Sequence, residues 1–417
     1  MINKQGAADR KGIFFVDAKD GFVKDGNKNR LREQDIKRIV DTWNARHDVP
    51  HYAKFVPISG ENSIEANDYN LNIPRYIQPA DTEICQDIDA HLHGGIPKHD
   101  VEQLSAYWTV CPSLRSALFD ETAERITLRT DKATIANVIA ADHSFIEQKN
   151  HFSRSIKAWC DNMRPLFRGL TTNIKPKALI EEWAQSLLDI MKEDKSLVDA
   201  YDAYQQLLTY WHDTLQDDCY IISHDGWKPT LLRGTKKTAT YEDMVCDLLP
   251  VGIVLNEYFA DELEEIATIT AERDEVAAEL QAMIDVVLDE SAEDDEDEIK
   301  ALTDEVKKTK EYKAKDKVRK AIDKRLKEKK AALTEAVAAK YAAFTEAEVI
   351  DLVVEKKWIA TITTMIQSEM QQVTQRLTAN IAAIVERYEQ TLSVIDAEVS
   401  DLEAKVNSHL AKMGFSL

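Results

Sequence analysis

The side chains best suited to chemistry lie close together in the first quarter of the chain, and they are Cys85, His91, His93 and His99. Imidazole nitrogens and thiolates are common zinc ligands, so the His-x-His pair could chelate a metal ion. The alternative is a tight turn whose histidines hydrogen-bond to the backbone around Gly94-Gly95. We favour the turn, and an enzyme that uses His91 and His93 is the functional hypothesis with the least support.

Two charged features of the N-terminal region could also be functional. Asp17 ends an apolar run, where α/β enzymes place functional carboxylates, but we favour a turn or cap aspartate. Lys28, Arg30 and Arg32 could bind DNA phosphates or form a solvated loop, and the sequence supports both equally. The chain contains no GxGxxG or Walker-type glycine loop and no GxSxG motif.

The 417-residue chain has a net charge of −21, which argues against a nucleic-acid surface spread over the whole protein. The charge is uneven: eight of the ten residues Asp289–Glu298 are acidic, whereas Lys307–Lys330 contains thirteen lysines and arginines. This order favours a helical hairpin over a disordered charged loop. We expect the basic segment to be a solvated helix face rather than a phosphate-binding strip.

The five cysteines are odd in number and widely spaced, which indicates a reducing compartment and argues against a disulfide framework. We find no signal-peptide pattern and no apolar run long enough to span a bilayer. The expected location is the cytoplasm, with no membrane partner.

The N-terminal elements are too few for a core of their own. We expect strands over Ile13–Ala18 and Tyr52–Ile58, and a helix over Glu33–Trp43 in which four apolar residues share a face. Two strands and one helix in eighty residues resemble the edge of a larger sheet. These four residues are Ile36, Ile39, Val40 and Trp43.

The rest of the chain is expected to be mainly α-helical. Asp100 and Gln103 have capping spacing and predict a helix start, and helices are expected over 135–160 and 178–215. The run 219–223 predicts a short strand. The predicted segments are a methyltransferase-like α/β edge over 1–80, a helical middle domain over 81–252 with a β element near 217–235, a charged helical hairpin over 253–344 and a C-terminal docking helix over 345–417.

No glycine lies between Gly252 and Gly414, and no proline follows Pro250. The absence of helix breakers predicts long antiparallel helices or a coiled coil. Thr345 and Glu348 form a capping box that would open the final helix. An apolar stripe from Val373 to Leu410 predicts one continuous helix that needs a partner helix.

The strings Ile13–Ala18, Asn29–Arg32 and Asn67–Ile77 resemble the modification (M) subunit of type I restriction-modification systems, a DNA adenine-N6 methyltransferase. In that family these segments close the carboxyl end of the methyltransferase domain. The turn His93–Pro97 and the segment Val353–Trp358 resemble the C-terminal extension of one branch of the family. The resemblance runs in order along nearly the whole chain, and Asn67–Ile77 is its most specific string.

The sequence departs from the family in the catalytic half. Family members bind S-adenosylmethionine on a glycine-rich loop and hold a flipped adenine with an Asn-Pro-Pro-aromatic motif, and neither string occurs here. The resemblance therefore implies the C-terminal part of an M subunit, inactive by itself. No catalytic, cofactor-binding or metal-binding residue can be assigned to this chain, and S-adenosylmethionine is implied only for the complete family member.

The resemblance also implies partners: the specificity (S) subunit, the N-terminal catalytic methyltransferase half, the restriction subunit and double-stranded DNA. Lys28, Arg30 and Arg32 would line the DNA channel. The alternative is a stand-alone coiled-coil interaction or regulatory protein that binds a restriction-system subunit. The residues predicted to face the S subunit are Trp358, Leu377, Ile384, Tyr388, Ile395 and Leu402.

The missing motifs lead to a direct prediction. The purified chain should release no heat of binding when titrated with S-adenosylmethionine in a calorimeter, because the strings that hold this cofactor in the family are not present. Micromolar binding would contradict the prediction, and a complete methyltransferase of the family serves as the positive control.

Overall fold

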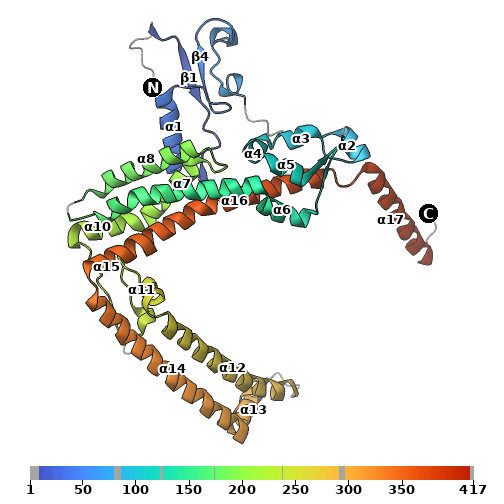
Figure 1. The fold of residues 1–417 in the computed structure, drawn as a ribbon. Coiled ribbons are helices and arrows are strands. Elements are labelled where there is room, and N and C mark those ends of the chain that lie inside the picture. Colours follow the sequence, from blue (N-terminus) through green and yellow to red (C-terminus); the bar gives the residue numbers. More distant parts are fainter. Residues whose placement is uncertain are drawn as a thin grey trace. The chain divides into compact units, whose positions relative to one another are not determined.

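The structure, a computed structural model, describes residues 9–78, 86–122, 125–172, 174–236, 238–290 and 296–413. The chain is mainly α-helical, as predicted, with short two-stranded sheets (Figure 1). It divides into two compact units. The first comprises Met1–Met163, Lys177–Asp213 and Ile362–Leu417, and the second comprises Arg164–Pro176 and Thr214–Thr361. The four segments expected from the sequence remain a prediction.

The first unit begins with a small α/β block. Strands β1 (Gly12–Val16) and β4 (Ala53–Pro57) pair antiparallel, β2 (Val23–Asp25) pairs with β3 (Lys28–Arg30), and α1 spans Glu33–Ala45. Strands β1 and β4 and helix α1 were predicted from the sequence, whereas β2 and β3 were not. Two 3-10 turns follow, η2 (Glu65–Asn67) and η3 (Ile73–Arg75). The small core of the block consists of Phe15, Val56, Ile64, Tyr76 and Ile77.

Short elements lead from this block into a helical bundle. They are α2 (Ile88–His93), α3 (Lys98–Glu102), α4 (Ser105–Val110), α5 (Pro112–Leu118), β5 (Phe119–Glu121), β6 (Ile126–Leu128), η4 (Lys132–Thr134) and α6 (Ile135–Ala141). The bundle helices are α7 (His143–Arg168), α8 (Pro176–Asp194), α9 (Ala200–Tyr210) and α16 (Ala360–Arg387). Trp159 is fully buried and donates from Nε1 to Ser186 Oγ at 2.9 Å, which ties α7 to α8.

The two helices expected over 135–160 and 178–215 are each interrupted. Asp142 separates α6 from α7, and its carboxylate accepts the Phe145 backbone N–H at 2.9 Å. Lys195 has a φ of +50°, and Asp199 caps α9 by accepting the Tyr201 N–H at 2.9 Å. Side-chain caps therefore start new helices inside continuous apolar patterns.

Asp100 does not cap a helix, so that prediction is wrong. Helix α3 starts after Pro97, and Asp100 lies inside it, fully buried. Its carboxylate accepts from Arg387 Nη1 at 3.1 Å, at the end of α16. A long-range ion pair, which sequence spacing does not reveal, determines the position of this residue.

The stripe from Val373 to Leu410 does not lie on one helix. Helix α16 ends at Arg387, and α17 (Leu392–Lys412) starts after Thr391, which is extended. Contacts with the region 87–132 hold the break: the buried Tyr388 ring lies 5.0 Å from that of His91, and Lys132 Nζ lies 2.5 Å from Glu389 Oε2. Tertiary contacts thus end a helix that no proline or glycine interrupts.

The second unit contains α10 (Gln216–Asp225), η6 (Tyr241–Asp243), α11 (Val251–Tyr258), α12 (Ala260–Glu290), α13 (Glu296–Lys308), α14 (Lys310–Ala343) and α15 (Glu346–Asp351), with a π-helical turn over Leu352–Ile359. Another π-helical turn, Trp211–Leu215, begins in the first unit and ends in the second. The strand predicted over 219–223 is wrong, because these residues belong to α10. Cys219 and Ile222 are buried on one helix face, whereas Tyr220 is exposed. Burial of that face outweighs the strand preference of the run Tyr-Ile-Ile.

Helices α12 and α14 run antiparallel, side by side (Figure 1), as the predicted hairpin requires. Ion pairs connect them: Lys315 Nζ lies 2.5 Å from Glu279 Oε2, and Lys329 Nζ lies 2.6 Å from Glu265 Oε2. These acidic partners come from the middle of α12. The side chains of the acidic run Asp289–Glu298 lie outside the described residues.

The capping box at Thr345 is confirmed. Thr345 Oγ1 accepts the Glu348 N–H, and the Glu348 carboxylate accepts the Thr345 N–H at 2.9 Å. The hydrogen bonds from Thr345, together with Lys340, lower the pKa of Glu348 to about 2. Within the described ranges, no helix combines the length and the apolar character needed to cross a membrane.

Lys357 and Asp218 form a buried ion pair in the second unit. Lys357 Nζ lies 2.8 Å and 2.7 Å from the two Asp218 oxygens and donates to the carbonyls of Asp247 and Leu248 at 2.6 and 3.0 Å. Trp358 Nε1 also donates to Asp218, at 2.7 Å. Burial raises the pKa of the Asp218 carboxyl, although both of these donors oppose the shift.

We expect Lys357→Met to lower the free energy of unfolding by about 3–5 kcal/mol, because it leaves a buried carboxylate without its counter-ion. The double variant Lys357→Met/Asp218→Asn removes both charges and keeps an acceptor for Trp358, so its free energy of unfolding should fall clearly less. Urea unfolding followed by tryptophan fluorescence measures both. Equal losses in the two variants would show that charge pairing is not what the site contributes.

Candidate functional site

Helix α1 is attached to α9 through its polar side. Gln34 Nε2 donates to Asp202 at 2.9 Å, the Gln34 N–H donates to Gln205 Oε1 at 3.1 Å, and Arg38 Nη1 lies 3.2 Å from Asp199. Gln34, and with it the Asp35 carboxylate, is buried. Helix α1 therefore buries its polar side, whereas an ordinary amphipathic surface helix buries its apolar stripe.

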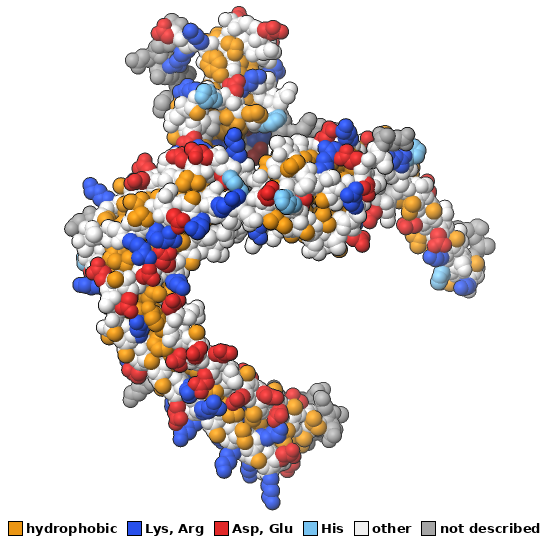
Figure 2. Space-filling model, viewed as in Figure 1, with side chains coloured by type: hydrophobic (Ala, Val, Ile, Leu, Met, Phe, Trp, Pro, Cys, Tyr) orange, Lys and Arg blue, Asp and Glu red, His pale blue; other side chains and the backbone are white. Residues whose placement is uncertain are grey.

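The apolar side of α1 is consequently at the surface. Ile36, Val40 and Trp43 are 50%, 45% and 48% exposed. Phe55 of β4 is also exposed, and Phe14 of β1 lies 6.4 Å from the Trp43 ring. Hydrophobic side chains are visible on this block in Figure 2. We call Ile36, Val40, Trp43 and Phe55 the α1 face; a soluble protein rarely leaves such a cluster uncovered.

Helix α17 is the second uncovered apolar element. None of its residues is buried, and six of its hydrophobic side chains, from Leu392 to Val406, are 39–59% exposed. Hydrophobic side chains on this helix are visible in Figure 2. Spacings of four, three and four place Ile395, Val399, Leu402 and Val406 on one stripe, which is the pattern of a coiled-coil seam. We call these four residues the α17 stripe.

The structure separates the six predicted interface residues into two groups. Ile395 and Leu402 are exposed on the α17 stripe. The other four are covered by this chain itself and offer no surface to another protein here. They are Trp358, Leu377, Ile384 and Tyr388.

The three predicted DNA-binding residues differ in exposure and in their contacts within the chain. Lys28 and Arg30 are exposed on strand β3, and Arg30 Nε lies 3.5 Å from Asp25. Arg32 instead closes the start of α1, where its guanidinium donates twice to Asp35 at 3.0 Å. That hydrogen bond raises the pKa of Arg32. Lys28 and Arg30 therefore remain available on the surface, whereas Arg32 has a local structural contact.

Asp17 makes the contacts of a turn aspartate. Its Oδ1 accepts the Lys19 N–H at 3.3 Å, and its Oδ2 lies 3.6 Å from Lys19 Nζ. These local contacts agree with the interpretation we favoured from the sequence.

The histidines of the Gly-Gly region do not converge. His91 contacts Gln86 at 2.7 Å, His93 contacts Asp89 at 2.8 Å and His99 contacts Asp100 at 3.1 Å. Their partners are thus side chains, not the backbone groups expected. Among the described residues no cluster of three or more potential metal ligands occurs, and Cys85 lies outside these residues.

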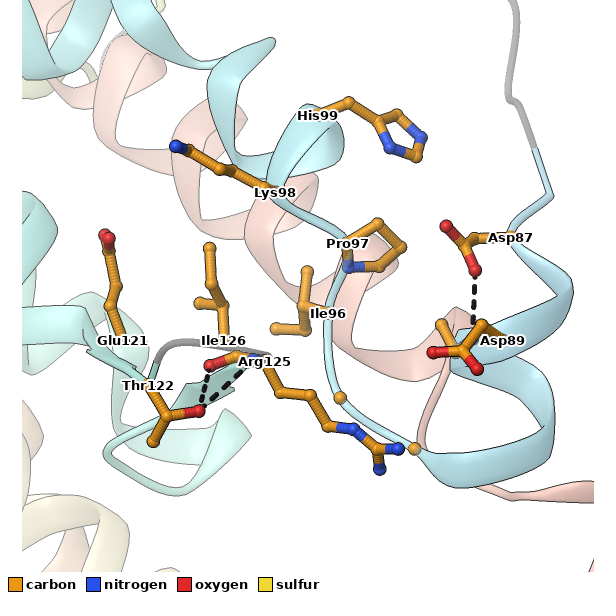
Figure 3. Close-up of a pocket in the computed structure, with 13 residues that line it drawn as sticks. Asp87, Asp89, Ile96, Pro97, Lys98, His99, Glu121, Thr122, Arg125 and Ile126 are labelled. Atoms are coloured by element: carbon orange, nitrogen blue, oxygen red, sulfur yellow. Dashed lines mark hydrogen bonds between the residues drawn. The ribbon is translucent and has the colours of Figure 1, made fainter.

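The Gly94-Gly95 turn borders a pocket of about 320 Å³ (Figure 3). The glycines have φ values of +77° and +90°, and the Ile96 N–H donates to the Ile126 carbonyl at 2.7 Å. Arg125 extends along the turn and donates to the His93 carbonyl. Because Asp87, Asp89 and Arg125 already bond within the chain, the turn serves packing rather than chemistry.

Comparison with known proteins shows what the N-terminal block is similar to. Residues 1–84 match the family model described as N-6 DNA Methylase. A stretch of 93 residues is 32% identical to the MjaVIII methylase subunit of a type I restriction enzyme from Methanocaldococcus jannaschii. The resemblance to type I methylase subunits is confirmed over this small part of the chain, and its extension along the rest of the chain stays a prediction. A second stretch, of 77 residues, is 29% identical to the MpnII methylase subunit from Mycoplasma pneumoniae.

These matches cover a small part of each protein. The first aligned stretch is 21% of this chain and 15% of the relative, and the second is 18% and 14%. The chain thus spans about 15% of the length of the curated relatives it matches. No solved structure matches.

Sequence reasoning missed the two most informative features. The Lys357–Asp218 pair joins residues 139 positions apart, and neither neighbourhood has a motif that indicates it. The outward orientation of the α1 face had a weak signal, because Asp35 and Thr42 share the opposite side of the predicted helix. Only the position of α9 shows which side is covered.

The turn leads to a stability prediction. Gly95→Ala should lower the free energy of unfolding by about 1–2 kcal/mol, because a left-handed backbone disfavours a Cβ atom. The new Cβ would also lie 3.1 Å from Arg125.

Gly252→Ala is the matched control, since it lies in α11 with no atom near its Cβ position. It should stabilise by about 0.5–1 kcal/mol. Urea denaturation measures both, and a neutral Gly95→Ala would show that the turn adapts freely.

Proposed function

We propose that this chain is the C-terminal part of the DNA adenine-N6 methyltransferase (M) subunit of a type I restriction-modification system. The observation that carries the proposal is that the segment similar to type I methylase subunits is also the block with an uncovered apolar face. A sheet edge and helix that belong to a larger domain would have this appearance when that domain is separate.

In this proposal the α1 face packs against the N-terminal catalytic half of the methyltransferase. Trp43 would be its centre, because large aromatic side chains dominate protein interfaces. The Arg46 guanidinium already lies 3.6 Å from the Trp43 ring centroid. S-adenosylmethionine and the target adenine would bind in that other half, which leaves this chain without a catalytic residue of its own.

The α17 stripe is proposed to dock on the specificity subunit. A helix of 21 residues is about 31 Å long at 1.5 Å per residue, which is enough for three heptads of coiled-coil contact. The specificity subunit, which reads the DNA sequence in this family, supplies the partner helices. Two M subunits and one S subunit would clamp duplex DNA in the cytoplasm, and Lys28 and Arg30 would face its phosphates. The restriction subunit would join this assembly.

A stand-alone interaction protein that binds a restriction-system subunit is the second candidate. The exposed α17 stripe favours it as much as the first, because docking on a specificity subunit needs no catalysis. The α1 face distinguishes the candidates: a separate chain that carries the Asn-Pro-Pro-aromatic motif should bind it only if the chain belongs to a methyltransferase.

Light scattering on a sizing column tests the proposal. The chain should form a stable complex with its cognate specificity subunit, and Ile395→Asp/Leu402→Asp should weaken binding at least about tenfold, since interface anchors contribute more than about 1 kcal/mol each. Because both residues are exposed, the melting temperature should stay unchanged.

Ala404→Asp is the matched control, because it adds a charge to the opposite side of α17. A chain that elutes unchanged in the presence of the specificity subunit would refute the docking role. An Ala404→Asp variant as weak as the double variant would show that the stripe is not the contact.

A further inference from the structure

The N-terminal block contains a cavity that none of the roles above explains. It measures about 630 Å³ and lies between the segment before and into β4, residues 48–54, and the segment 62–78. The string Asn67–Ile77, the most specific part of the family resemblance, supplies much of its wall. The lining residues that the argument uses are Asp48, His51, Lys54, Asn62, Asn67 and Arg75.

The backbone around this cavity is strained. His51 and Asn62, which line it, have φ values of +59° and +57°, and the neighbouring Asp68 and Tyr69 have +52° and +56°. In the described ranges only Arg46 and Lys195 are further non-glycine residues with positive φ. Asn, Asp and His adopt this conformation several times more readily than other side chains, so Tyr69 is the unusual residue of the four; strained positions of this kind cluster at ligand sites.

The charged side chains that line the cavity are two cations, Lys54 and Arg75, and one carboxylate, Asp48. The Asp48 carboxylate already accepts the Phe55 N–H at 2.8 Å, and Asn67 donates to the Ser63 carbonyl at 3.0 Å. The side chains of Lys54, Asn62 and Arg75 make no hydrogen bond or ion pair with any residue that the structure describes. Lys54 and Arg75, two exposed cations without an ion-pair partner among the described residues, outnumber the single Asp48 carboxylate, which favours an anionic ligand.

Packing fixes the backbone beside Arg75, which lines one side of the cavity. The ring of the adjacent Tyr76 stacks on Phe15 at 4.7 Å with an interplanar angle of 17°, and its hydroxyl donates to the Asn70 carbonyl at 2.5 Å. Tyr76 itself is buried in the small core. The backbone at Arg75 is therefore fixed by its neighbour, whereas the Arg75 side chain is exposed and can reach a ligand in the cavity.

We infer that this cavity binds a backbone phosphate of DNA, with Arg75 and Lys54 as the phosphate contacts and Asn62 as an additional donor. Arginine is well suited to this role because its planar fork donates two hydrogen bonds to one phosphate. The inference rests on the proposed function, since it assumes that the chain meets DNA. It adds a second phosphate contact, distinct from Lys28 and Arg30 on β3.

Fluorescence anisotropy with a labelled duplex of about 20 base pairs tests the inference at several salt concentrations. Each phosphate contact contributes about 0.9 to the slope of log affinity against log salt. Lys54→Gln/Arg75→Gln should therefore make the slope shallower by about 1.8 and weaken binding about tenfold or more at low salt. Arg75→Lys, which keeps the charge, should recover part of the affinity.

Lys175→Gln/Lys177→Gln is the matched control, because it removes the same charge from exposed lysines outside the cavity. If the control pair weakened DNA binding equally, the effect would be one of net charge, and the proposed site would be overturned. Unchanged affinity and slope in Lys54→Gln/Arg75→Gln would also overturn it. Binding of AMP that these variants abolish, with DNA binding intact, would assign the cavity to a free nucleotide instead.

The outcome is separable from that of the proposed function. The complex with the specificity subunit depends on α17 and not on the cavity. A wild-type chain that forms this complex and binds the duplex, but loses no affinity in Lys54→Gln/Arg75→Gln, would reject the phosphate site alone, whereas a chain that forms no complex would reject the docking role.

Discussion

The buried ion pair between Lys357 and Asp218 is the interaction on which the second unit depends. One ammonium group donates to one oxygen of the Asp218 carboxylate and to two backbone carbonyls, and the neighbouring Trp358 donates to the other carboxylate oxygen. These contacts connect α10, the chain around residues 247–248 and the π-helical turn. A charge in such surroundings is tolerated only with complete partners, so the pair demands one arrangement of these three segments.

The aromatic side chains around this pair follow from the same arrangement. Trp358 is fully buried, and the rings of Phe167 and Trp227 each lie 5.6 Å from it. Trp227 donates to the Leu170 carbonyl at 2.9 Å. The position that sequence reasoning assigned to a partner interface is thus the centre of a core. Exposed apolar side chains lie elsewhere, on α17 and on the α1 face.

The first unit shows how a polar attachment can expose an apolar surface. Because α1 is held to α9 by amide and carboxylate contacts, its apolar side faces outward. Exposed apolar area costs free energy in water, roughly 25 cal/mol per Å². The uncovered face lies in the same block that is similar to type I methylase subunits.

The sequence by itself determined the local structure where local rules are strong. The lack of helix breakers predicted the long helices α12 and α14, the Thr345–Glu348 capping box predicted a helix start, and an acidic run followed by a basic run predicted the hairpin. Periodicity also located β1, β4 and α1. These features depend on neighbours within a few positions, and such neighbours can be read directly from the chain.

Only the tertiary structure decided which faces are covered. The run around Ile222 became a helix because Cys219 and Ile222 are buried, and α16 ended at Arg387 because Asp100 binds it from almost three hundred positions away. The tertiary structure also brings Lys54 and Arg75 to one cavity, which their separation in the sequence does not indicate. Burial and ion pairing join residues that are distant in sequence, and a pattern of spacings in one chain carries no record of those distances.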